Sequence, residues 1–93
     1  MRGVWKRTVW IAHKILPGQM TPDRPVKRSL TLQGHRTSVS MEAAFWDEFQ
    51  RIARINGVSV NALATELDRD RVPPASLASA IRLYVLQQIK AGH

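Results

Sequence analysis

Polar and apolar residues alternate from Arg36 to Met41, and the alternation ends where a helical pattern begins. The polar positions are Arg36, Ser38 and Ser40, and the opposite positions are Thr37, Val39 and Met41. This period of two predicts a β-strand with one face on a hydrophobic core and the other on water or a partner. A short strand is not stable alone, and no other segment repeats this pattern well, so we expect it to pair with the same segment of a second copy.

A second alternating stretch, Ser29 to Gln33, precedes this strand. Its apolar residues, Leu30 and Leu32, lie on even positions, whereas Val39 and Met41 lie on odd ones. Either one continuous strand changes its inward face at a bulge near Gly34, or the stretch is a separate short edge strand. The pattern leaves both open.

From Glu42 to Asn56 the period changes to that of a helix. The apolar half of the helical wheel holds Phe45, Trp46, Phe49, Ile52, Ala53 and Ile55. Glu42 is placed favourably near the positive end of this helix, and Asn56-Gly57 tolerates the left-handed conformation that closes one. The pattern predicts an amphipathic helix packed on the strand.

Two further helices are expected after short turns. Ser59 is a candidate N-cap for the first, whose apolar stripe is Val60, Leu63, Ala64 and Leu67. Pro73-Pro74 ends that pattern, and Ser76 can cap a last helix running to about Lys90.

The last helix is apolar on two sides. One side holds Leu77, Ile81, Tyr84 and Val85, and another holds Leu83 and Leu86. Because so small a chain cannot easily cover both sides, we expect part of this helix to pack on a second subunit.

Charge is distributed unevenly along the 93 residues, which carry a net charge of +7. Residues 1–40 hold eight basic side chains and one acidic one, and residues 41–93 hold six of each. A basic excess around the candidate strand is typical of a surface that meets a polyanion, although a solvated basic tail has the same composition. The absence of cysteine excludes disulfides and thiolate chemistry.

The N-terminal region differs in character from the rest. Residues 1–16 could form a basic amphipathic helix ended by Pro17-Gly18, and Met20 is an alternative natural start. We expect residues 1–26 to be an extension and linker and residues 27–90 to be one domain. No apolar run reaches the roughly 20 residues of a membrane span, so no membrane association is expected.

The order of strand, helix, short turn and helix resembles the ribbon-helix-helix family of DNA-binding regulators. The resemblance is carried by Arg36-Thr-Ser-Val-Ser-Met41, by Phe45-Trp46, and by Asn56-Gly57-Val58-Ser59-Val60-Asn61. The run from Lys27 to Met41, together with Ser76 to Leu86, is similar to a subgroup with a third helix. The resemblance covers residues 27–89 and implies a mainly α fold with one short β-strand and an intertwined two-fold dimer.

The resemblance also implies roles for particular residues. It places Arg36, Ser38 and Ser40 as base-reading side chains in the major groove. It seats phosphates on the start of the second helix, Ser59, Val60 and Asn61, and we add Lys27, Arg28 and His35 as phosphate contacts. The expected dimer core is Thr37, Val39, Met41, Phe45, Phe49, Leu63 and Leu67.

We therefore expect a bacterial, cytoplasmic, nucleoid-associated transcriptional regulator that binds double-stranded DNA as a homodimer, with tetramers on DNA an open alternative. The competing hypothesis is an interaction module, such as an antitoxin or adaptor, that binds a protein through the last helix or the N-terminal extension. No enzyme activity, cofactor or metal is expected, because His13, His35 and His93 are scattered without ligand spacing and no phosphate-binding glycine loop is present.

Overall fold

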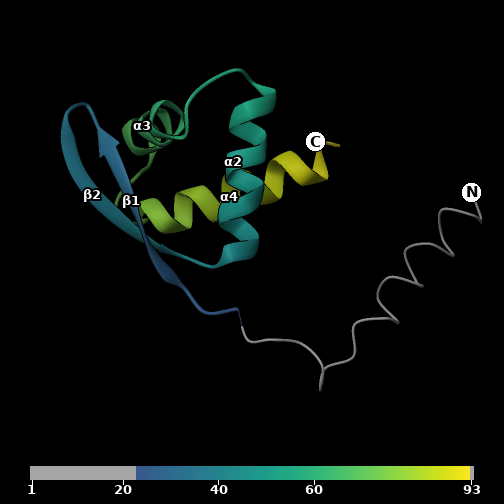
Figure 1. Ribbon diagram of the computed structural model, residues 1–93, viewed down its shortest axis with the longest axis horizontal. Helices are drawn as coiled ribbons and strands as arrows, with labels where there is room; N and C mark the ends of the chain where they lie inside the picture. The colour runs from purple at the N-terminus through teal and green to yellow at the C-terminus, as the bar shows by residue number, and fades with distance from the viewer. Residues whose placement is uncertain (1–22, 93) are drawn as a thin grey trace, which may run out of the picture.

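The computed structural model describes residues 23–92, which form a β-hairpin backed by helices (Figure 1). The elements in chain order are β1 (Val26–Leu32), β2 (His35–Met41), α2 (Ala43–Ile55), α3 (Val60–Asp70) and α4 (Leu77–Lys90). A ribbon followed by two helices and a third is therefore confirmed as the fold. The amphipathic helix expected over residues 1–16 and the alternative start at Met20 lie outside the described residues.

The strand that pairs with β2 comes from the same chain. β1 runs antiparallel to β2, from Val26 opposite Met41 to Leu32 opposite His35. The expectation of one strand without a good partner in its own chain is therefore wrong, and the alternative of a separate short strand before Gly34 is the correct one. Pairing with a second copy, if it occurs, must use an edge that this hairpin leaves free.

The hairpin turn explains why the apolar residues change from even to odd positions. Gln33 and Gly34 connect the strands with φ angles of 52° and 83°, the positive values that a two-residue type I′ turn requires. A two-residue connection places each even-numbered residue of one strand opposite an odd-numbered residue of the other, as Leu30 lies opposite Thr37. The two patterns therefore share one inward face.

The core lies between the inward face of the hairpin and the three helices. Its members are Leu30, Val39, Met41, Phe49, Ile52, Ala53, Leu63, Ala64, Ile81 and Val85. The phenyl ring of Phe49 lies edge-on to the ring of Tyr84, with 6.4 Å between their centroids, which joins α2 to α4. Ile55, expected on the inward half of α2, is 56% exposed because the helix ends there, beyond the core.

The helix boundaries agree with their expected signals. The Ser59 Oγ accepts a hydrogen bond from the Ala62 N–H at 2.9 Å, and the Ser76 Oγ accepts one from the Ser79 N–H at 3.1 Å. Both predicted N-caps are confirmed. Gly57, with φ of 69°, closes α2 through a hydrogen bond from the Val58 N–H to the Ala53 carbonyl.

The two apolar sides of α4 have different surroundings. Ile81 and Val85 are buried against the other helices, whereas Leu83, Leu86 and Ile89 are 57%, 49% and 47% exposed. Residues 23–92 therefore cover only one side of α4, in agreement with the two-sided apolar pattern of its sequence. None of the helices in the described range is long and apolar enough to cross a membrane.

Candidate nucleic-acid interface

The outward face of the hairpin is a polar surface formed by both strands. Its side chains are Lys27, Ser29 and Thr31 on β1 and Arg36, Ser38 and Ser40 on β2, and all six are exposed. Val39 and Met41 are buried on the other face. The expected directions of Arg36, Ser38 and Ser40 are therefore observed, and the structure adds three side chains from β1 to the same face.

The two edges of the hairpin differ in their free backbone groups. The pair next to a two-residue turn is hydrogen bonded and the pattern then alternates, so the N–H and C=O groups of Thr31, Arg36 and Ser38 point away from the hairpin. On β1, the Thr31 N–H donates to the Asn61 Oδ1 at 3.0 Å. On β2, those of Arg36 and Ser38 have no partner within residues 23–92. The Ser29 groups on β1 are likewise unpaired within the described residues, and the Ser40 carbonyl on β2 accepts from Arg82, so both edges keep free groups. We call the run through Arg36 and Ser38 the open edge of β2.

The three basic residues expected to contact phosphate lie on different faces. Lys27 shares the outward face with Ser40, which lies opposite it. Arg28 lies on the inward face, where its Nε donates to the Met41 carbonyl at 3.4 Å and its guanidinium lies 5.9 Å from the Trp46 ring centroid. His35, opposite Leu32, also lies on the inward side. Only Lys27 accompanies the expected base-reading set, and phosphate binding by the three stays a prediction.

The start of α3 lies beside β1. The N–H groups of Val60 and Asn61 have no acceptor among the described residues, since the cap of Ser59 bonds Ala62 instead. The side chain of Asn61 holds this helix start to β1 through Thr31. A helix start with free N–H groups can accept an anion, and here it is held next to the hairpin.

The residues expected in a dimer core separate into two groups. Val39, Met41, Phe49 and Leu63 are already buried by their own chain, whereas Phe45 and Leu67 are half-buried and Thr37 is exposed. Thr37 borders a hollow of about 520 Å³ between the hairpin and the helices, with His35 and Ser38 on β2, Thr65 and Arg69 on α3, and Leu77 on α4. The hollow reaches the open edge of β2.

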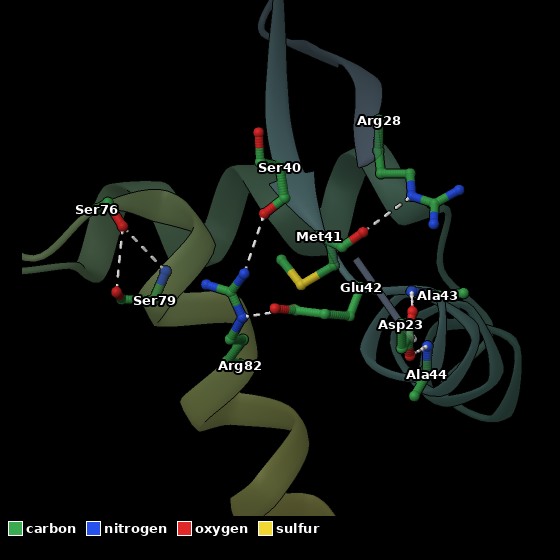
Figure 2. A network of polar contacts seen from close by, with 10 residues as sticks. All are labelled: Asp23, Arg28, Ser40, Met41, Glu42, Ala43, Ala44, Ser76, Ser79 and Arg82. Atoms are coloured by element: carbon green, nitrogen blue, oxygen red, sulfur yellow. Dashed lines mark hydrogen bonds and ion pairs between the residues drawn. The ribbon is translucent and has the colours of Figure 1, made fainter. Parts of the chain in front are cut away.

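A polar network holds the end of β2 to α4 (Figure 2). The Arg82 Nε lies 2.8 Å from the Glu42 Oε1, and its Nη2 donates to the Ser40 carbonyl at 3.2 Å. The Arg82 guanidinium that hydrogen bonds to Glu42 lowers the pKa of that carboxyl below its ordinary value. Arg82 also lies 6.0 Å from the Phe45 ring centroid. The sequence alone contains no signal for this network.

A second contact in the same region comes from the residues before β1. The Asp23 carboxylate accepts hydrogen bonds from the N–H groups of Ala43 and Ala44 at 2.9 and 3.0 Å (Figure 2). Asp23 thus provides the side-chain cap of α2 that Glu42, at the N-cap position, does not make. Asp23 is the lone acidic residue in a basic stretch, which is the sequence signal that could have identified a special role for it.

Comparison with known proteins agrees with this architecture. Residues 25–89 match the sequence profile of a ribbon-helix-helix domain. The match includes both strands and nearly all of α4. No curated protein and no solved structure shows a significant match to the chain.

Proposed function

Because the chain belongs to the ribbon-helix-helix family, we propose that it is a DNA-binding transcriptional repressor that acts as a homodimer. In this proposal two copies of β2 pair antiparallel along their open edges, and the resulting ribbon enters the major groove. The protein acts without catalysis, in the cytoplasm on the nucleoid of a bacterium.

The observation that carries this proposal is the outward row of Arg36, Ser38 and Ser40 beside a strand edge with unpaired backbone groups. An exposed edge of this kind pairs readily with another strand. Pairing β2 with β2 centres the row on a two-fold axis, which suits a palindromic DNA site. Arg36 is the longest side chain of the row and can donate two hydrogen bonds to guanine, while the serines can bond to several bases.

Phosphate contacts would hold this ribbon in register. We propose the free N–H groups at the start of α3 and the ammonium of Lys27 for this role. Arg28 is better suited to a structural role, since its partly buried guanidinium lies over Trp46 on the inward side of the hairpin. His35 faces the hollow, so we do not assign it to DNA.

Fluorescence anisotropy with two DNA duplexes tests the proposal. One duplex carries the sequence upstream of the protein's own gene and the other is random. We expect tighter binding to the first, with an affinity that falls steeply as salt is added.

Arg36→Ala should remove about 1–3 kcal/mol of the preference between the duplexes. Lys90→Ala, at the end of α4 far from the hairpin in Figure 1, is the charge-matched control and should keep the preference. Equal binding of both duplexes by the wild type would refute specific repression.

The exposed side of α4 supports a second function, as an interaction module for another protein. Leu83 lines a shallow hollow of about 290 Å³ together with Val72 and Tyr84. Leu86, on the same helix, is 49% exposed. Exposed apolar groups of this kind are typical of protein contact sites. Purification of the native protein under DNA-free conditions with a stoichiometric protein partner, lost in Leu86→Gln, would support this function over repression.

A further inference from the structure

The hairpin makes the outward surface wider than a two-stranded ribbon. β1 lies on the side of β2 away from the open edge. If two copies pair through that edge, as in the proposed function on which this inference rests, the strands lie in the order β1, β2, β2 and β1 of the second copy. The base-reading rows of the two copies then form the centre of a four-stranded sheet, and both β1 strands lie at its margins.

A four-stranded sheet is too wide to enter the major groove as one unit. Neighbouring strands lie about 4.8 Å apart, so the two outer strand axes are separated by roughly 14 Å before side chains are added. The major groove is about 12 Å wide. The twist between neighbouring strands, about 20–25°, turns the outer strands further from the direction of the groove. The central pair can face the base edges, and each outer strand must then lie over a sugar-phosphate wall.

The outward side chains of β1 suit that position. Lys27 supplies a positive charge, and Ser29 and Thr31 supply hydroxyl donors at every second residue. The facing positions on β2 hold Arg36 and two serines, so no carboxylate lies on the outward face of either strand. The surface therefore presents hydrogen-bond donors to DNA phosphates, and no carboxylate on it repels them.

A hydrogen bond places the start of α3 on the same flank. The Asn61 Oδ1 accepts from the Thr31 N–H, which points away from β2. The free N–H groups of Val60 and Asn61 therefore lie beyond β1 as seen from the centre of the sheet. Phosphates held by this helix start are on the wall that β1 would cover.

We infer that β1 is a phosphate-contacting strand, with Lys27, Ser29 and Thr31 donating to the sugar-phosphate wall on each side of the groove that the β2 ribbon enters. This strand adds affinity that does not depend on base sequence. It also limits how deeply the central ribbon enters, which leaves base recognition mainly to the long side chain of Arg36.

Site-specific cleavage tests the position of β1 directly. The natural chain has no cysteine, so a single introduced thiol can carry an iron chelate that cuts nearby DNA backbone. On the duplex from upstream of the gene, we expect Ser29→Cys to cut both strands at two places flanking the centre of the site. Ser38→Cys should cut at the centre, and Gln87→Cys, on α4, should not cut. A Ser29→Cys protein that binds the duplex normally and gives no cleavage would overturn the inference.

Binding measurements test the contribution of the three side chains. Lys27→Ala should weaken the binding of specific and random duplexes by the same factor. It should lower the slope of log affinity against log salt by about 1.8 per dimer, or about 0.9 for each phosphate that the variant no longer neutralises. Ser29→Ala and Thr31→Val should also weaken binding to the specific and the random duplex by equal factors, so that the preference between the two does not change.

The outcomes separate this inference from the proposed function. If the wild-type protein binds neither duplex, both the proposed function and this inference are refuted. A different outcome is a wild-type protein that prefers its own upstream sequence, with Lys27, Ser29 and Thr31 variants that bind as it does. That outcome removes this inference, and with it the phosphate contact proposed for Lys27, and leaves specific repression through the β2 ribbon intact.

Discussion

Arg82 shows how one side chain can determine the geometry of a candidate binding surface. It extends from α4 to the end of β2, where it bonds the Ser40 carbonyl and the Glu42 carboxylate. The ion pair is partly exposed, with 29% and 24% of the two side chains accessible, so its attraction is screened by water. Its main effect is to fix where the outward row ends relative to the helices.

The Glu42–Arg82 contact predicts a pH dependence of stability. Since the folded-state pKa of Glu42 is lowered, the unfolded chain binds protons first as the pH falls. The contribution of the contact is therefore complete above the ordinary glutamate pKa and is lost as the pH drops through the folded-state value. We expect Glu42→Gln to be less stable than the wild type in urea at neutral pH, with a difference that shrinks below about pH 4.

Glu66→Gln serves as the control for this experiment, because Glu66 is exposed on α3 and makes no ion pair within residues 23–92. It should follow the wild-type profile. If the difference in stability between Glu42→Gln and the wild type stays constant as the pH falls below about 4, the Glu42 carboxylate contributes through something other than its charge.

The hairpin is the element that gives the surface its width, and its turn depends on backbone conformation. An added Cβ on Gly34 would meet nothing within 4 Å, so space does not demand glycine here. The backbone conformation does favour glycine, because Gly34 has a φ of 83°, a left-handed value that residues with a side chain rarely adopt. The turn is therefore specified by backbone energetics and not by packing.

Two substitutions in the turn should have opposite effects. Gly34→Ala should lower the free energy of unfolding by about 1 kcal/mol. Gln33→Asn should raise it, since Asn-Gly is preferred in type I′ turns. Urea denaturation monitored by circular dichroism measures both. Equal stability of all three proteins would indicate that the turn adopts another conformation in solution.

At the scale of the whole molecule, the open edge of β2 and the exposed side of α4 are two surfaces that residues 23–92 leave uncovered. They lie on different elements and can be tested separately. The first belongs to the proposed ribbon, and the second to any assembly beyond it.

A matched pair of proline variants tests pairing through β2. Ser29 and Ser38 lie opposite each other, and the N–H of each points away from the hairpin, so neither substitution removes a bond between β1 and β2. Ser38→Pro should abolish the dimer and DNA binding, because it removes a donor from the open edge. Ser29→Pro should keep the dimer. Sedimentation equilibrium measures both, and identical behaviour of the two variants would exclude the β2 edge as the interface.

The exposed side of α4 is tested by replacing its apolar residues. We expect the double variant, Leu83→Gln and Leu86→Gln, to remain a dimer without further assembly. It should also no longer co-purify with a protein partner. Stability should change by no more than about 0.5 kcal/mol per site. Ile55→Gln, on the equally exposed end of α2, is the control and should assemble as the wild type does. Unchanged assembly of the double variant would mean that this side of α4 is not an interface.

The amino-acid sequence by itself determined the features that depend on neighbours along the chain. Periodicity alone indicates the three helices and the outward direction of Arg36, Ser38 and Ser40. The caps of α3 and α4 at Ser59 and Ser76 depend on hydrogen bonds that span only a few residues. Even the hairpin was signalled locally, by the change from Leu30 and Leu32 to Val39 and Met41 across Gly34. A gap of two residues produces that change in parity.

The tertiary structure decided what depends on residues far apart in the chain. Arg82 reaches Glu42 across forty residues, Asn61 bonds Thr31 across thirty, and Asp23 caps a helix twenty residues later. These contacts fix how the hairpin lies against the starts of α2 and α3 and against α4. Periodicity indicates which side of an element is apolar, and only the packing of elements against one another determines what each polar side chain can reach.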